Sequence, residues 1–157
     1  MNKIELGDIF ELITEKRKKI YLQCVEIPVD TKNEIELIKV FYDLWDDTPK
    51  DLNSIISGDY FFCRFPLKAA LRKKIIVKLG KSVLPENFTP PEFYRTINFT
   101  GDCWQIVDSK TLKRRTVTIL SSEEKSLSPW GMMNDTLIID LLERGWRLET
   151  WTLDNMF

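Results

Sequence analysis

The stretch at residues 101–108, GDCWQIVD, contains a cysteine between two acids and beside a tryptophan. A thiol there could serve as a nucleophile, but a nucleophilic cysteine must ionise, and a neighbouring cation or a helix N-terminus favours ionisation. The charge adjacent to Cys103 in the sequence is that of Asp102, which opposes ionisation. We therefore expect Cys103 to be a partly exposed strand residue without a catalytic role.

The other two cysteines alternate with large apolar residues, as residues that face a core from a strand do. Cys24 stands two residues after Leu22, and Cys63 two residues after Phe61. Three cysteines at wide spacing, with no Cys-x-x-Cys pair, fit neither a disulfide framework nor a cysteine-built zinc site. We expect all three to be free thiols, as in a reducing compartment.

The chain contains no histidine. Catalytic triads of the Ser-His-Asp kind, Cys-His nucleophile pairs and histidine metal sites are therefore impossible within it. Its six glycines occur singly, so a glycine-rich phosphate loop and a dinucleotide fingerprint are also missing from the sequence. We expect a protein that is not an enzyme and that uses no cofactor and no metal.

Six acidic residues lie close together between residues 34 and 51. Neighbouring carboxylates such as Asp46 and Asp47 could act as general acid and base or hold a divalent cation, but neighbours in sequence rarely have the separation that such chemistry needs. They also suit a solvated strand end and the start of a helix. A third interpretation is an acidic edge that meets a basic protein. The acids concerned are Glu34, Glu36, Asp43, Asp46, Asp47 and Asp51.

Two tryptophans lie where they could anchor a protein interface. Trp45 is next to the acidic residues, and Trp130 lies in the loop-like stretch Ser128-Pro-Trp-Gly131. Tryptophan is enriched among the residues that dominate binding energy at interfaces. The sequence therefore predicts a partner-binding site made of Asp43, Trp45, Asp46, Asp47, Asp51 and Trp130.

Basic residues form three short clusters, at residues 16–19, 72–74 and 113–115. Such clusters could contact the phosphates of a nucleic acid, so a nucleic-acid-binding β-barrel module is one alternative function that the sequence allows. The other is an enzyme that uses Cys103 or carboxylates such as Asp46. Lysines at turns and strand edges also prevent unwanted strand pairing. The chain has 23 basic and 24 acidic residues, so no global positive field favours nucleic acid or an anionic membrane.

The chain shows neither the apolar core of a signal peptide near its first residue nor a run of about 18 apolar residues that could span a membrane. We therefore expect a cytoplasmic protein. Its 157 residues, 43% of them hydrophobic, are enough for one well-filled core. We expect a single domain over residues 1–157.

Short apolar runs rich in β-branched and aromatic residues, separated by Gly, Pro and charged turns, predict a mainly β fold. We expect a strongly bent antiparallel sheet or a partly open SH3-like barrel with one or two short helices. Apolar residues on both faces of the run at residues 35–45 indicate a central strand. The other predicted strands are residues 8–13, 20–27, 59–65, 75–79, 103–107, 116–120 and 146–153.

Two helices are predicted from their end signals. Thr48, followed by a proline and then by Asp51, is typical of a capping box, so we expect a helix from there to Gly58. A second helix is expected between a cap at Asn134 or Asp135 and a stop at Gly145. Residues 66–74 could be a helical turn or an extended edge, and the prolines of residues 81–100 predict a surface loop.

Several motifs follow one another in a recognisable order: GDIFEL, IYLQCVEI, IKVFYDLW, PPEFYRTI and CWQIVD. This succession resembles the Immunity protein 26 family of bacterial polymorphic-toxin systems. The resemblance spans most of the chain, although each motif is short, and the opening Gly-Asp-x-Phe hairpin is also similar to the start of many small SH3-like barrels. The matching residues are Gly7, Asp8, Phe10, Tyr21, Gln23, Phe41, Pro91, Phe93 and Trp104.

The resemblance implies a bacterial cytoplasmic protein that binds a cognate toxin domain and neutralises it by occlusion, without enzymatic activity. It assigns turn geometry and core packing, and no toxin contact, to the matching residues. The carboxylates of the acidic stretch would then meet a basic surface of the toxin, with Trp45 or Trp130 as an anchor.

Overall fold

The computed structural model describes residues 3–29 and 35–155. In these residues the chain forms eight strands and three α-helices, and the strands make two antiparallel sheets, so the mainly β prediction is confirmed. The larger sheet has the order β4-β3-β2-β1-β5, and the smaller has the order β6-β7-β8. The sheets consist of β1 (Asp8–Ile13), β2 (Lys19–Glu26), β3 (Leu37–Phe41), β4 (Tyr60–Arg64), β5 (Ile76–Lys81), β6 (Phe93–Ile97), β7 (Trp104–Asp108) and β8 (Arg114–Val117).

The larger sheet is covered on both faces, as the apolar pattern of its central strand predicted. Alternate residues of its strands, such as Phe10, Leu22 and Val40, face the main core. The intervening residues, such as Tyr21 and Phe41, pack in a second cluster on the opposite face. Its outer strands β4 and β5 do not pair with each other, so within the described residues the sheet does not close into a barrel.

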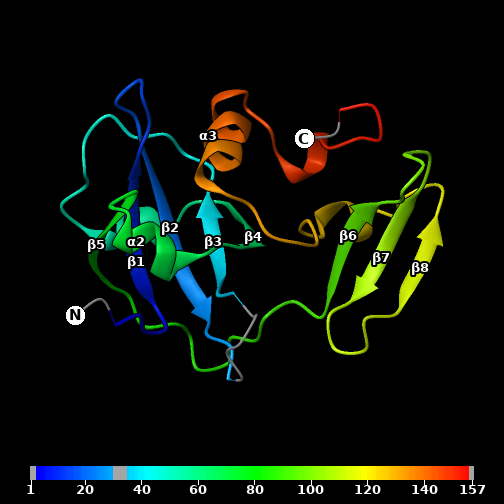
Figure 1. Cartoon of the computed structure of the whole chain (residues 1–157), viewed down its shortest axis with the longest axis horizontal. Helices are drawn as coiled ribbons and strands as arrows, with labels where there is room; N and C mark the ends of the chain where they lie inside the picture. Colours follow the sequence, from blue (N-terminus) through cyan, green and yellow to red (C-terminus); the bar gives the residue numbers. More distant parts are fainter. Residues whose placement is uncertain (1–2, 30–34, 156–157) are drawn as a thin grey trace.

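The two sheets lie side by side along the long axis of the molecule, with α3 near the upper end of β3 (Figure 1). They share one core, because Trp104 and Ile106 of β7 belong to the same buried cluster as the inner residues of β1 to β4. The helix α3 (Asp135–Glu143) adds Ile138 and Leu141 to this core. The side chain of Asn134 caps α3, and Gly145 follows its end with a φ of +73°, so both predicted end signals are confirmed.

A short extended segment at residues 128–133 joins the two sheets. It pairs with β6 through the bonds from Arg95 N to Ser128 O at 3.0 Å and from Trp130 N to Arg95 O at 2.9 Å. It then pairs with β4, where Arg64 N donates to Gly131 O at 3.2 Å and Met133 N donates to Arg64 O at 2.9 Å. We call the line along which β4, this segment and β6 lie next to one another the seam.

Some predicted elements have different bounds or types in the structure. The helix α1 (Leu52–Ile56) begins later than expected, because Asp51 and not Thr48 accepts the capping hydrogen bond. Residues 66–74, for which a helical turn and an extended edge were both expected, contain the helix α2 (Leu67–Arg72). The predicted loop at residues 81–100 contains β6, and the predicted last strand is replaced by a 3₁₀ turn, η2 (Leu148–Thr150). A further 3₁₀ turn, η1 (Glu124–Ser126), precedes α3.

No helix in the described part of the chain is both long enough and apolar enough to cross a bilayer.

Candidate functional site

The predicted acidic residues mostly lie in one loop, residues 42–51, which leaves β3 and leads to α1. Asp43 and Asp47 are exposed, and neither carboxylate has a hydrogen bond or an ion pair within the described residues. Asp46 is exposed and pairs with Lys18, and Asp51 accepts a hydrogen bond from Asn53 N at 2.9 Å as the cap of α1. The acidic loop therefore offers two uncompensated carboxylates to a partner.

The other two acids of the predicted group do not contribute to this loop. The side chain of Glu36 is buried beside the main core. Glu34 lies outside the described residues.

The acidic loop is fixed to the larger sheet by a buried carboxylate. Glu11 of β1 is 5% exposed, and it accepts hydrogen bonds from the hydroxyls of Thr48 at 2.7 Å and Tyr21 at 3.1 Å. The backbone of Trp45 forms a two-way pair with Lys19, with N···O distances of 2.7 and 3.0 Å. These contacts hold the backbone of the loop that carries the exposed carboxylates.

Trp45 packs against the larger sheet, so only part of its side chain is available to a partner. Its ring is half-buried and stands edge-on to Tyr21, with the ring centroids 6.1 Å apart. It packs with Ile9 and Phe41 in the cluster on the opposite face of the larger sheet. An aromatic residue held in this way gives a partner one edge of its ring without a large conformational cost.

A hollow of about 510 Å³ opens at the seam, next to the end of the acidic loop. Such a volume is in the range of sites that hold a small molecule or a side chain of a partner. Tyr42 N donates to Asp59 O at 3.0 Å, so the loop and the start of β4 meet at the mouth of this hollow. The lining residues are Tyr42, Asp59, Tyr60, Phe62, Pro91, Phe93, Ser122, Lys125, Ser126, Leu127, Ser128, Leu148 and Glu149.

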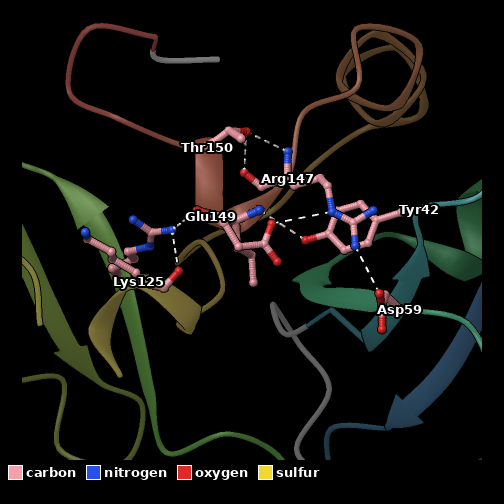
Figure 2. Close-up of polar contacts among 8 residues, drawn as sticks. Tyr42, Asp59, Lys125, Arg147, Glu149 and Thr150 are labelled. Atoms are coloured by element: carbon pink, nitrogen blue, oxygen red, sulfur yellow. Dashed lines mark hydrogen bonds and ion pairs between the residues drawn. The ribbon is translucent and has the colours of Figure 1, made fainter. Parts of the chain in front are cut away.

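Arg147 contacts three residues that line the hollow, Tyr42, Asp59 and Glu149 (Figure 2). Its guanidinium donates to Asp59 at 3.1 Å, lies 3.4 Å from a carboxylate oxygen of Glu149, and stands 4.2 Å from the centre of the Tyr42 ring. Two carboxylates and an aromatic face therefore surround one cation, and the flat face of arginine suits this arrangement. The burial of Tyr42 raises the pKa of its hydroxyl to about 12.

A buried arginine positions the far wall of the same hollow. Arg95 of β6 is fully buried, and its guanidinium donates to the carbonyl oxygens of Leu127 at 3.1 Å, Lys125 at 2.9 Å and Leu148 at 2.5 Å. It also lies 4.8 Å from the centre of the Trp104 ring and 4.5 Å from that of the Trp151 ring, and these two rings pack edge-on against each other with their centres 4.9 Å apart. Burial lowers the pKa of Arg95 to about 10, which leaves it charged at neutral pH.

Trp130, the other predicted anchor, is not near the acidic loop. Its half-buried ring packs edge-on to Tyr94 at 5.5 Å, in a cluster with Val25 and Leu37 that is separate from the cluster around Trp45. It borders a second and larger hollow on the seam, of about 1240 Å³, and Pro91 borders both hollows. The structure therefore brings together the acidic loop and the first hollow, and leaves Trp130 on a different part of the seam.

Sequence reasoning missed the residues around the first hollow. Asp59 lies 88 residues before Arg147, so no local pattern in the sequence links these two charges. Glu149 lies close to Arg147 in the sequence and pairs with it. The one available signal was the alternation Arg147-Leu148-Glu149, which was interpreted as a strand. In the structure residues 148–150 form the 3₁₀ turn η2, Arg147 precedes it as its N-cap, and Glu149 lines the hollow.

The three cysteines are free thiols, and two of them are buried. Cys24 and Cys63 are buried in the main core, as predicted, and burial raises the pKa of Cys24 to about 12 and that of Cys63 further above its ordinary value. Cys103 is half-buried, and its backbone N–H donates to the Asn98 side chain at 3.1 Å. Within the described residues, no group of three or more carboxylate or thiol side chains could hold a metal ion.

No protein-family model, curated protein or solved structure matches this chain. The site is therefore interpreted from its own geometry: an acidic loop held to the larger sheet, whose first residue, Tyr42, lines an aromatic-walled hollow, an arrangement suited to binding.

Proposed function

We propose that this chain is an immunity protein, which binds a cognate bacterial toxin domain in the cytoplasm and blocks it by occlusion. The observation that supports this most is the pair of exposed carboxylates, Asp43 and Asp47, which have no partner within the described residues and stand on a loop that is bonded to the larger sheet. Free charges on a rigid surface accelerate encounter with a surface of opposite charge. The order of the sequence motifs resembles that of the Immunity protein 26 family, and this resemblance is the reason for proposing a toxin as the partner.

The acidic loop and the first hollow have different tasks in this proposal. The loop attracts a basic surface of the toxin over a distance of about one Debye length, roughly 8 to 10 Å in physiological salt. The hollow then receives a side chain of the toxin between Tyr60 and Phe93, which are both partly exposed. Interfaces typically combine such a desolvated aromatic pocket with a charged rim.

Co-expression tests this function directly. The product of the gene immediately upstream would be produced alone, with this protein, and with an unrelated small β protein as control. We expect the upstream product alone to stop growth, and we expect this protein to restore growth and to be recovered with it in a stoichiometric complex. A harmless upstream product that forms no complex would contradict the proposal.

The alternative, binding to nucleic acid, rests on the basic residues 113–115. All three are exposed, but Arg115 is paired with Glu124 at 2.7 Å and Arg114 donates to Gln105 at 2.9 Å. Binding to phosphates would have to compete with these contacts, so this alternative has less support than protein binding.

A further inference from the structure

The free edges of the two sheets differ in how they are protected. A strand at the edge of a sheet exposes unpaired N–H and C=O groups, which another strand can pair with. The segment at residues 128–133 covers part of the outer edges of both β4 and β6, because its backbone bonds to Arg64 on one side and to Arg95 on the other. The edges that remain in the described structure are those of β5 and β8.

The edge of β5 has features that discourage pairing. Its register with β1 shifts between Ile9 and Phe10, and such a bulge bends an edge away from regular geometry. Two of its lysines form ion pairs along the strand, Lys78 with Asp8 at 3.1 Å and Lys81 with Glu5 at 2.7 Å. An added strand would meet an irregular backbone there.

The edge of β8 is regular and open. Its four residues pair with β7 without a shift in register, from Trp104 with Val117 to Val107 with Arg114. β8 is the outermost strand of the smaller sheet, at the end of the molecule farthest from β5 (Figure 1). Neither a proline nor a bulge interrupts it.

The register shows which backbone groups of β8 face away from the sheet. Asp108 N donates to Lys113 O at 2.9 Å, so residues 108 and 113 form a hydrogen-bonded pair. In an antiparallel ladder such pairs alternate, so Arg115 and Val117 also direct their backbone groups to β7. The N–H and C=O groups of Arg114 and Thr116 therefore point outward, where a further strand would lie.

The side chains along this edge give it a positive charge. Lys113, Arg114 and Arg115 are consecutive and exposed, and the carboxylate that pairs with one of them belongs to Glu124 on η1. Exposed apolar side chains stand on both sides of the cationic residues: Leu112 is 64% exposed and Ile119 is 85% exposed. A strand that pairs here would place its own side chains beside cations and beside these two apolar residues.

We propose that the outer edge of β8 binds an extended, acidic segment of a partner protein, which adds to the smaller sheet as a fourth strand. The outward backbone groups of Arg114 and Thr116 supply main-chain hydrogen bonds, and Lys113 and Arg114, which have no ion pair within the described residues, attract acidic side chains. This inference goes beyond the proposed function, because it does not require the partner to be a toxin and uses a surface away from the acidic loop.

A synthetic peptide tests the site. The probe is a peptide of about eight residues in which glutamates alternate with valine or threonine, and the control is the same peptide with lysines in place of the glutamates. We expect the acidic peptide to bind, to slow amide hydrogen exchange at Arg114 and Thr116, and to bind less tightly as salt is added. The lysine peptide should not bind.

Two variants separate strand addition from simple charge attraction. Thr116→Pro removes an outward N–H without removing a bond to β7, and we expect it to weaken peptide binding by about tenfold or more, whereas Thr116→Val should bind as the unaltered protein does. Reversal of charge by Lys113→Glu with Arg114→Glu should abolish binding. The matched reversal Lys68→Glu with Arg72→Glu, on exposed residues of α2, should have little effect.

Three results would overturn this inference. One is the absence of binding to the acidic peptide at millimolar concentration, and another is equal binding by Thr116→Pro in a protein that circular dichroism shows to be folded. The third is tight binding of a short DNA duplex that the charge reversal abolishes and Thr116→Pro leaves unchanged, because the cations would then be a phosphate-binding site.

Discussion

The hydroxyl of Thr48 donates a 2.7 Å hydrogen bond to the buried carboxylate of Glu11 and thereby ties the acidic loop to β1. A buried carboxylate must be hydrogen-bonded, because an unpaired charge in the interior is costly. Thr48 was expected to start a helix, but its side chain serves this carboxylate, and the cap of α1 moves to Asp51. This bond therefore helps to hold the backbone of the acidic loop against β1.

Replacing Thr48 by valine tests this dependence. The substitution keeps the shape of the side chain and leaves Glu11 without one of its donors, so we expect the free energy of unfolding to fall by about 1 to 2 kcal/mol. Urea unfolding followed by tryptophan fluorescence measures it. The same change at Thr118, which is exposed and makes no side-chain hydrogen bond within the described residues, is the control and should cost less than about 0.5 kcal/mol.

Arg95 makes contacts that lysine cannot reproduce. Its planar guanidinium donates to the carbonyl oxygens of three residues and lies 4.8 and 4.5 Å from the centres of two tryptophan rings, those of Trp104 and Trp151. A lysine there would keep the charge but lose most of these contacts, so we expect Arg95→Lys to lower the free energy of unfolding by roughly 2 to 4 kcal/mol. Arg114→Lys on the exposed β8 is the matched control. Equal stability of the two variants would show that Arg95 does not hold the wall of the hollow.

Alkaline pH should destabilise the fold through its buried tyrosines. Burial raises the pKa of Tyr21, Tyr42 and Tyr94 to about 12, from an ordinary value of 10.0. In the unfolded chain these phenols lose their protons first, so their contribution to stability is complete below about pH 10 and is lost as the pH rises towards 12. We expect the urea midpoint to be steady from about pH 6 to 8, to fall gradually near pH 9, where the buried thiols of Cys24 and Cys63 begin to ionise in the unfolded chain, and to fall sharply above about pH 10. A midpoint that stays unchanged to about pH 11.5 would be inconsistent with this burial.

The three thiols should differ in reactivity. Cys24 and Cys63 are buried with raised pKa values, whereas Cys103 is half-buried. A disulfide reagent added to the native protein should therefore modify Cys103 and leave the other two intact until the protein is unfolded. Cys103→Ser should remove the reaction of the native protein and leave partner binding unchanged. Loss of binding in this variant would give Cys103 a role that its surroundings do not indicate.

Much of the fold could be predicted because its signals are local. The alternation of apolar residues in β1 to β4 and the caps of α3 each depend on a few neighbouring residues, and both are confirmed. β6 was missed because prolines dominate the stretch before it, while its pairing with β7 and with residues 128–130 depends on distant segments. The final stretch alternates like a strand, but Leu148 N donates to the hydroxyl of Tyr42 and the stretch turns at η2.

The candidate site could be predicted only in part, for the same reason. Asp43 and Asp47 were found because acidic residues cluster in the sequence, and the structure leaves them exposed. Arg147 and its partner Asp59 were not found, since the fold brings them together across 88 residues of sequence. Trp130 was grouped with the acidic loop on composition alone, and the structure places it on another part of the seam.

The rate of association between this protein and the upstream gene product tests the central claim most directly. Asp43→Lys with Asp47→Lys reverses the two free carboxylates, and Glu86→Lys with Asp154→Lys makes the same change in net charge at exposed positions elsewhere. We expect the first variant to associate about tenfold more slowly or worse at low salt, with a weaker dependence on salt, and the second to associate nearly as the unaltered protein does. Equal rates for both variants would contradict the claim that the acidic loop is the surface that meets the toxin.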